Sequence, residues 1–236
     1  MVALIDGDLV LYRCACSAEE ESFEIAAHRA NELLDLLLEK TQADSYRFFI
    51  SGKGNFRKQI YPEYKANRTQ PKPKHLQDLR EWACQEVNAE VTENELETDD
   101  YLGIYQKDDT IICSLDKDLL QIPGRHYRWA IGTAKWSKDE EFIEQTELEG
   151  LRLFYEQCLK GDSSDNVKGI SGLGDKRAKK LLQDCNTEQE MLQVCLENYS
   201  HEEEFLLNAQ CLWILRDFDD YYIKRFERLQ NEVQNP

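Results

Sequence analysis

The chain has 236 residues, a length that fits one large domain or a core domain with a small appendage. A hydrophobic content of 41% is enough for a packed core, and 10% aromatic residues argue against disorder. The formal net charge of −17 speaks against nucleic acid as a partner, at least as an average over the chain. No run approaches the ~18 apolar residues of a membrane span, and the N-terminus MVALIDGD has no signal-peptide character. We therefore expect a cytoplasmic protein with no membrane partner.

The cysteines and the basic residues are distributed in an informative way. The eight cysteines include no CxxC pair, which predicts reduced, packed thiols rather than a zinc site or disulfides. Lys53 to Arg80 holds eight Lys/Arg against two acids, and Lys168 to Lys180 holds five against one. The chain therefore contains basic segments although its net charge is strongly negative.

Short apolar runs alternate with amphipathic stretches along the chain. In chain order, the predicted elements are a strand at 2–5, a helix at 30–38, a strand at 46–50, a helix at 76–87, a strand at 110–114 and a helix at 148–159. Residues 53–74 are basic, contain prolines and lack periodicity, which indicates a mobile loop or arch. The alternation predicts an α/β fold with a parallel sheet and helices on both faces. Ligands bind beyond the carboxyl ends of the strands in such sheets.

Acidic residues occur in four motifs, two of which follow predicted strands. The candidate metal ligands are Asp6 in LIDGD, Glu97, Asp99 and Asp100 in ETDD, Asp116 and Asp118 in SLDKD, and Asp162 and Asp165 in GDSSDN. Each motif alone has an ordinary interpretation as a solvated loop, turn or helix cap, and Asp8 is interpreted as the N-cap of a helix that begins at Leu9. Glu97 or Thr98 could cap a helix, and Asp162 and Asp165 share a face if their segment is helical. Together, carboxylates without His or Cys favour Mg²⁺ or Mn²⁺, and two such ions roughly 4 Å apart would suit phosphoryl displacement.

The segment GDSSDNVKGISGLGDKRAKKLL predicts a phosphate clamp. A glycine turn would let backbone N–H groups approach a phosphate, and the helix that follows presents basic side chains. The residues concerned are Gly169, Gly172, Gly174, Lys176, Arg177, Lys179 and Lys180. The alternative is an ordinary helical hairpin whose glycines serve only as caps.

A second basic segment, FRKQIYPEYKANR, could contact the phosphates or the bases of a nucleic acid. Arg57, Lys65 and Arg68 could contact phosphates, and Tyr61 or Tyr64 could stack on a terminal base. Lys65 could also stabilise charge on the scissile phosphate. The alternative is a merely solvated basic loop.

Taken in order, these motifs resemble the 5′-nuclease superfamily, which includes flap endonucleases, the 5′-exonuclease domain of bacterial DNA polymerase I and phage 5′–3′ exonucleases. The resemblance runs from Val2 to Leu182, and the compact length is most similar to the exonucleases of T7-like phages. It implies a PIN-like core over 1–158, with a basic loop or arch at 53–80, and a helix–three-turn–helix DNA-binding region over 159–236. It also implies two Mg²⁺ ions held by the eight acids, and a K⁺ ion at the carbonyls of the Gly169 to Gly174 turn. Lys65 and Arg57 match basic residues near the scissile phosphate, and Tyr64 matches a base-stacking aromatic.

One position departs from the family pattern. Relatives carry an Asp just after the second strand, whereas FFISGKGNFRK has no acid between Ile50 and Arg57. Ser51 or Gly52 takes that place, which predicts that the metal site nearest Asp6 is either weaker or completed by water or Asp8.

The leading hypothesis is a monomeric 5′–3′ exonuclease of phage replication that acts on duplex DNA with a 5′ end or flap, with RNase H-type activity on RNA–DNA hybrids as an option. The alternatives are a PIN-type ribonuclease and a catalytically silent duplex-DNA-binding protein.

Overall fold

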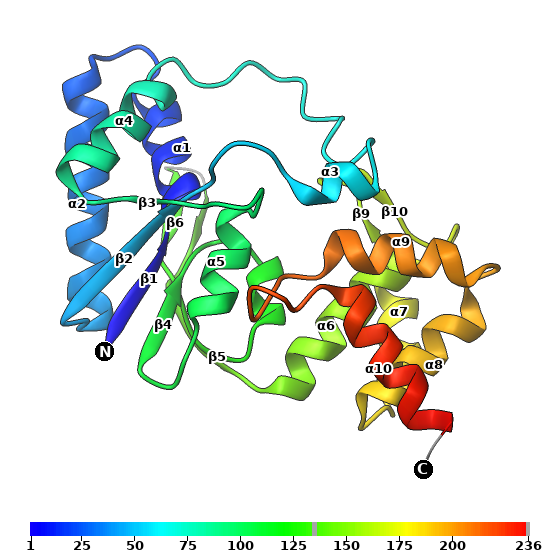
Figure 1. The fold of residues 1–236 in the computed structure, drawn as a ribbon. Coiled ribbons are helices and arrows are strands. Elements are labelled where there is room, and N and C mark those ends of the chain that lie inside the picture. Colours follow the sequence, from blue (N-terminus) through cyan, green and yellow to red (C-terminus); the bar gives the residue numbers. More distant parts are fainter. Residues whose placement is uncertain (134–135, 235–236) are drawn as a thin grey trace. The chain divides into compact units, whose positions relative to one another are not determined.

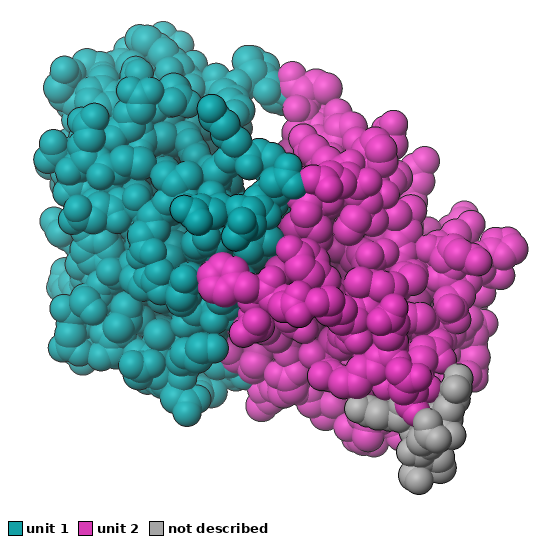
Figure 2. All heavy atoms as spheres, in the orientation of Figure 1, with its two compact units in different colours: residues 1–54, 70–119, 124–145 teal, residues 55–69, 120–123, 146–236 magenta. Residues whose placement is uncertain are grey.

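The structure, a computed structural model, describes residues 1–133 and 136–234 and forms two compact units (Figure 2). Unit 1 comprises Met1–Gly54, Gln70–Leu119 and Gly124–Gln145. Unit 2 comprises Asn55–Thr69, Leu120–Pro123 and Thr146–Pro236. No helix in the described part of the chain is long and apolar enough to span a membrane.

Unit 1 is built on a six-stranded sheet with the order β3-β2-β1-β4-β5-β8. Its strands are β1 (Val2–Asp6), β2 (Ser45–Ile50), β3 (Glu90–Val91), β4 (Thr110–Cys113), β5 (Gly124–Arg128) and β8 (Glu141–Gln145). All neighbours pair in parallel except β8, which runs antiparallel to β5. A separate ribbon pairs β6 (Ile131–Thr133) with β7 (Trp136–Lys138).

Helices cover both faces of this sheet (Figure 1). They are α1 (Gly7–Ser17), α2 (Phe23–Thr41), α4 (Leu76–Glu86) and α5 (Thr98–Tyr105). Side chains alternate along a strand, so Ala3 and Ile5 of β1 join the core under α1, α2 and α4. On the other face, the ring of Phe49 lies edge-on to Tyr101 and stacks on Tyr105 of α5.

The three predicted strands and the three predicted helices are confirmed. The predicted parallel sheet flanked by helices is confirmed, with one antiparallel strand at its edge, because β8 pairs antiparallel with β5. The described residues between β5 and β8 form the β6–β7 ribbon and no crossover helix, and such a connection brings a strand back antiparallel.

Unit 2 is helical and is organised around α6, which packs against α7, α8 and α9. Its elements are α3 (Phe56–Ile60), α6 (Glu147–Lys160), β9 (Gly161–Asp162), β10 (Val167–Lys168), α7 (Asp175–Leu182), α8 (Glu188–Asn198), α9 (Glu202–Leu212) and α10 (Tyr222–Gln234). A short 3₁₀ helix at Asp118–Gln121 lies where the chain passes between the units. The rings of Phe154, Trp213 and Tyr222 contact one another in the core.

Two predicted boundaries differ from those of the compact units. The predicted division lies at 158/159, whereas α6 packs against α7, α8 and α9 and belongs entirely to unit 2. Residues 53–80 do not form one loop or arch. Residues 55–69 belong to unit 2, where α3 packs against α9, whereas residues 70–80 belong to unit 1 and include the first turns of α4.

Candidate active site

Asp6, the last residue of β1, lies at the carboxyl edge of the sheet beside the end of β4. The two strands are parallel, with Ile5 opposite Cys113, so the residues that follow them lie level with each other. The hydroxyl of Ser114 donates to Asp6 Oδ2 over 2.6 Å, and Ser114 Oγ itself accepts from the N–H of Asp116 over 3.0 Å. The N–H of Asp118 in turn donates to Asp116 Oδ1 over 2.9 Å. The predicted grouping of LIDGD with SLDKD at one edge is therefore confirmed.

Asp6 is a buried carboxyl group in a negatively charged setting. Only 4% of the residue is exposed. Burial is the main reason why the pKa of Asp6 is raised to about 7, and the charges of Asp8 and Asp116 raise it further. Hydrogen bonds from Ser114 and from the N–H of Leu9 lower the pKa and only partly offset these effects. At neutral pH such a carboxyl group is only partly ionised, and a compensating positive charge beside it would favour the ionised form.

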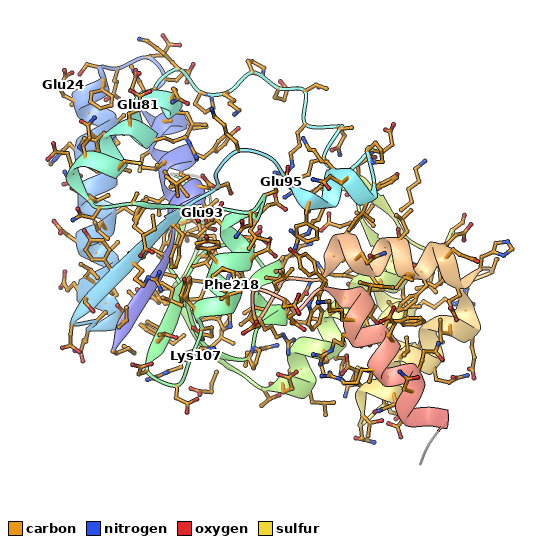
Figure 3. The ribbon with its side chains drawn as sticks, viewed as in Figure 1. Glu24, Glu81, Glu93, Glu95, Lys107 and Phe218 are labelled. Atoms are coloured by element: carbon orange, nitrogen blue, oxygen red, sulfur yellow. The ribbon has the colours of Figure 1, made fainter. Side chains whose placement is uncertain are left out.

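The ETDD motif forms the beginning of α5, as predicted. Glu97 is the N-cap and closes a capping box with Asp100, whose Oδ2 accepts from the Glu97 N–H over 3.0 Å. Asp100 is fully buried, whereas Glu97 and Asp99 are half-buried. Two further acids, Glu93 and Glu95, lie exposed in the loop just before the motif (Figure 3).

Asp8 has a different role from the predicted one. Asp6, not Asp8, caps α1, because the strand passes directly into a helix that begins at Gly7. The Asp8 carboxylate instead accepts from the N–H of Ser51, from the hydroxyl of Thr98 and from the guanidinium of Arg80. Sequence reasoning missed Arg80 and Ser114; the position of Ser114 directly after β4 was the only local signal for either.

In the described ranges, no group of three or more Asp, Glu, His or Cys side chains is arranged so that it could hold a metal ion. That the eight acids hold two metal ions stays a prediction. Six of the eight belong to unit 1, namely Asp6, Glu97, Asp99, Asp100, Asp116 and Asp118, and Asp162 and Asp165 belong to unit 2. Several of these carboxylates accept hydrogen bonds from nearby backbone N–H groups, as Asp100, Asp116 and Asp162 do.

In unit 2, the PEYKANR loop is docked on the GDSSDN turn, although about 100 residues separate them. The N–H of Lys65 donates to the Asp165 carbonyl over 2.8 Å, and its Nζ lies 3.7 Å from Asp165 Oδ2. The Arg68 guanidinium pairs with Asp165 Oδ1 over 2.6 Å. Asp162 lies in the β9–β10 ribbon and accepts from the N–H of Ser164 over 2.7 Å. The segment is not helical, so Asp162 and Asp165 do not share a helix face.

Arg57 and Tyr64 are buried, which corrects two expectations. Only 2% of Arg57 is exposed, and its guanidinium donates to the carbonyls of Cys211 over 3.0 Å and Trp213 over 2.6 Å. Only 2% of Tyr64 is exposed, and its hydroxyl donates to Asp165 over 2.9 Å. Arg57 therefore anchors α3 to the end of α9 rather than facing a phosphate. Tyr64 is not available to stack on a base. Of the two cations in PEYKANR, the Arg68 side chain is 56% exposed and the Lys65 side chain 14%.

The glycine turn before α7 has open space around it. Gly172 has φ of +75°, and a side chain at Gly172 or Gly174 would meet nothing within 4 Å. Four basic side chains are exposed on α7, those of Lys176, Arg177, Lys179 and Lys180. Lys179 and Lys160 both pair with Asp175, whose pKa is lowered by these bonds.

Gly169 differs from the other two glycines. A Cβ there would lie 2.1 Å from the carbonyl carbon of Lys160 and 2.2 Å from the Gly161 N atom. Gly169 is therefore required for close backbone packing, and its contact with a phosphate stays a prediction.

Comparisons with known proteins agree on one family. Residues 1–149 match the family described as 5′-3′ exonuclease, N-terminal resolvase-like domain. A DNA polymerase I from Chloroflexus aurantiacus is 28% identical over 213 residues, which cover 77% of this chain and 22% of that protein. A 5′-3′ exonuclease from Bacillus subtilis is 30% identical over 155 residues, which cover 60% of this chain and 52% of that protein. The chain thus spans between a fifth and about half of the length of these relatives.

Solved structures of proteins from bacteriophage T5 share the fold. One, co-crystallised with metal ions, superimposes with a TM-score of 0.66 at 14% identity and covers 98% of both chains. Another is a flap endonuclease in a pseudo-enzyme-product complex with DNA and metal ions, with a TM-score of 0.59 at 14% identity over 99% of both chains. The order of the motifs, the sheet and the match over 1–149 lead to one conclusion: the chain belongs to the 5′-3′ exonuclease family of nucleases.

Proposed function

We propose that the chain is a metal-dependent 5′–3′ exonuclease that hydrolyses DNA phosphodiester bonds from 5′ ends and at 5′ flaps. The observation that carries this proposal is Asp6, buried at the sheet edge with a pKa raised to about 7 and hydrogen-bonded through Ser114 to the Asp116 segment. Buried acids with raised pKa values cluster at functional sites. The family membership supplies the class of reaction.

The carboxylates of unit 1 fit a divalent cation in their chemistry. All of the proposed donors are oxygens, which favours Mg²⁺, with Mn²⁺ as a substitute. The negative charges that raise the pKa of Asp6 would be compensated by such an ion. Asp6, Glu97, Asp99, Asp100, Asp116 and Asp118 of unit 1 would hold it, and Asp162 and Asp165 of unit 2 would help to hold a second. Asp165 would do so by exchanging its bond to Arg68 for the ion, since the Arg68 side chain is 56% exposed. When bound, such ions activate water and stabilise the leaving oxygen.

The chain's own residues would position the substrate. Lys65 and Arg68 are held by Asp165 and would neutralise charge on the phosphate that is cut. The open turn at Gly172 and Gly174 would let backbone N–H groups reach a DNA phosphate, next to the exposed cations of α7. Carbonyls of the Gly169 to Gly174 turn could hold a K⁺ ion. None of these contacts reads a base, so we infer recognition of DNA structure rather than sequence.

Several finer points belong to the same proposal. The protein would act as a monomer in the cytoplasm, on the DNA of a replicating phage or cell. RNA–DNA hybrids would be cut if the 2′-hydroxyls of the RNA strand fit the site. The rival candidate is a silent duplex-DNA-binding protein, which is favoured by the absence of an acid at Ser51 and by the engagement of Asp8 with Arg80.

The test uses blunt and 5′-flapped duplex DNA of one sequence, labelled at the 5′ end, with Mg²⁺, Mn²⁺ or EDTA. We expect release of nucleotides or short fragments with either metal and none with EDTA. Binding without cleavage in both metals would favour the silent DNA-binding protein. Faster cleavage of single-stranded RNA of the same sequence would favour a PIN-type ribonuclease.

A further inference from the structure

The place where relatives carry an acid after β2 is occupied here by four hydrogen-bonded residues. Asp8, Ser51, Arg80 and Thr98 come from α1, the end of β2, α4 and α5, and we call them the Ser51 network. The N–H of Ser51 donates to Asp8 Oδ2 over 2.9 Å, and the Thr98 hydroxyl donates to the same oxygen over 2.8 Å. The Arg80 guanidinium bridges Asp8 Oδ1 and the Ser51 carbonyl oxygen.

Arg80 is held in place by its helix. The neighbouring α4 residues Leu79 and Ala83 are fully buried, and α4 packs against α1, which carries Asp8. The side chains of Arg80 and Asp8 are 25% and 32% exposed, so their ion pair is partly withdrawn from water. A guanidinium presents its donors in a rigid fork, which suits a bridge between two acceptors better than an ammonium does.

The hydroxyl groups of the network must point in one direction. The Thr98 hydroxyl donates its proton to Asp8, so it accepts at the 3.1 Å contact with Ser51, whose hydroxyl is the donor there. Ser51 Oγ in turn accepts from the Thr98 N–H over 3.0 Å. A relay of this kind strengthens each bond that ends on the negative charge of Asp8.

We propose that Arg80 supplies a fixed positive charge at this position and thereby withdraws Asp8 from divalent-metal binding. The inference rests on the proposed function, because it assigns which acids of that site hold metal. A carboxylate offers about four acceptor positions. Three donors already occupy the Asp8 carboxylate, and one of them is the positively charged guanidinium of Arg80. The missing acid at Ser51 and the engaged acid at Asp8 are therefore two parts of one arrangement.

The arrangement also makes Arg80 a positioning residue for α5. Thr98 lies between Glu97 and Asp99, two of the proposed ligands, and both its N–H and its hydroxyl are bound within the Ser51 network. Through Asp8 and Ser51, Arg80 fixes the direction in which α5 begins.

Mn²⁺ binding to the DNA-free protein tests the proposal by calorimetry, with the variants Asp8→Asn, Arg80→Met and the double variant. Asp116→Asn serves as a control for a proposed ligand. We expect Asp8→Asn to bind Mn²⁺ within about twofold of the wild type, and Asp116→Asn to bind about tenfold more weakly. Arg80→Met should bind about tenfold more tightly, or bind one further ion, because it frees the Asp8 carboxylate. The double variant should lose that gain.

A tenfold loss in Asp8→Asn, or weaker Mn²⁺ binding in Arg80→Met, would overturn the proposal. A purely structural Arg80 would weaken Mn²⁺ binding when removed, and would not produce a gain that depends on Asp8. Thermal unfolding in EDTA supplies a reading without metal. Arg80→Met should lower the melting temperature, and adding Asp8→Asn should recover part of it, whereas two purely additive losses would count against the pairing. If Asp116→Asn does not weaken Mn²⁺ binding and the other variants behave as expected, the proposed metal site is wrong. The comparison of the Asp8 and Arg80 variants then still decides the role of Arg80.

Discussion

At the scale of single residues, Asp6 shows how the same carboxyl group can serve as a helix cap and as a candidate ligand. Its Oδ1 accepts from the first turn of α1, and its Oδ2 accepts from Ser114. Both bonds favour the ionised form, yet burial outweighs them and raises the pKa. The folded chain without metal therefore stores unfavourable charge at this position.

The raised pKa of Asp6 predicts a pH-dependent effect of Asp6→Asn. The pKa is about 7 in the folded chain against an ordinary 3.8, so the protonated carboxyl favours folding below pH ~4, and this contribution is lost as the pH rises through about 7. At pH 8 without metal, we expect Asp6→Asn to raise the free energy of unfolding by roughly 2–4 kcal/mol. At pH 4, the gain should shrink below about 1 kcal/mol. Urea unfolding at the two pH values measures both, and an equal effect at both would count against the burial of the charge.

Arg57 and Lys65 belong to the same 55–69 segment, but we expect their replacement to have different effects. Arg57→Met removes a buried donor from two carbonyls and should lower the free energy of unfolding by roughly 2–4 kcal/mol. Lys65→Met should change stability by less than about 1 kcal/mol and slow cleavage by roughly 100-fold. Denaturant unfolding and single-turnover cleavage of the two variants separate the roles. If the Arg57→Met protein is stable but inactive, the result would support a contact between Arg57 and a phosphate, which the structure argues against.

At the scale of elements, the β9–β10 ribbon and the turn before α7 both depend on glycine, for different reasons. Gly161 has φ of +77°, and its Cβ would lie 2.2 Å from the Gly169 N atom. Gly172 has φ of +75° but open space around it. An added side chain at Gly161 would therefore meet both backbone strain and a steric clash, whereas one at Gly172 would meet backbone strain alone.

Replacing each glycine by alanine should show this difference. Gly172→Ala should lower the free energy of unfolding by about 1–2 kcal/mol, the cost of a left-handed conformation for alanine. Gly161→Ala should lower it by roughly 3 kcal/mol or more, because the backbone must also shift. Equal losses in urea unfolding would mean that the ribbon accommodates the added methyl group.

Local patterns in the sequence predicted the regular elements well and the contacts between distant segments poorly. The apolar runs at 2–5, 46–50 and 110–114 became β1, β2 and β4, because buried parallel strands are continuously apolar. The edge position of Asp6 followed from that pattern. No local pattern indicates that the PEYKANR loop docks on the turn at Asp165, or that Arg57 reaches the end of α9. From the sequence alone, basic residues in an irregular stretch are expected to be exposed to solvent, because their distant partners cannot be identified.

The engagement of Asp8 was hidden for the same reason. Its distance in sequence from Arg80 and Thr98 is 72 and 90 residues, and an acid two positions after a strand suggests a cap. Asp6 took that role because α1 begins without an intervening loop. The absence of an acid at Ser51 was visible in the sequence, whereas the cation beside it was not.

At the scale of the whole molecule, the proposed activity draws on both units. Unit 1 carries six of the eight proposed metal ligands, and unit 2 carries the loop with Lys65 and Arg68, the turn before α7 and the remaining two acids. The net charge of −17 is therefore compatible with DNA binding, since the basic 55–69 and 168–180 segments both belong to unit 2. The carboxylates of unit 1 would repel the phosphates of DNA unless cations were bound among them.

The central claim is that the acids at the sheet edge hold metal for cleavage and are not needed for DNA binding. Single-turnover cleavage and binding of one 5′-labelled flap duplex in Mg²⁺, compared between the wild type and Asp116→Asn, tests it directly. We expect cleavage to fall by roughly 1,000-fold or more in the variant, with the dissociation constant for DNA within about threefold of the wild type. Normal cleavage by Asp116→Asn would contradict the account, as would a loss of DNA binding that explains the loss of cleavage.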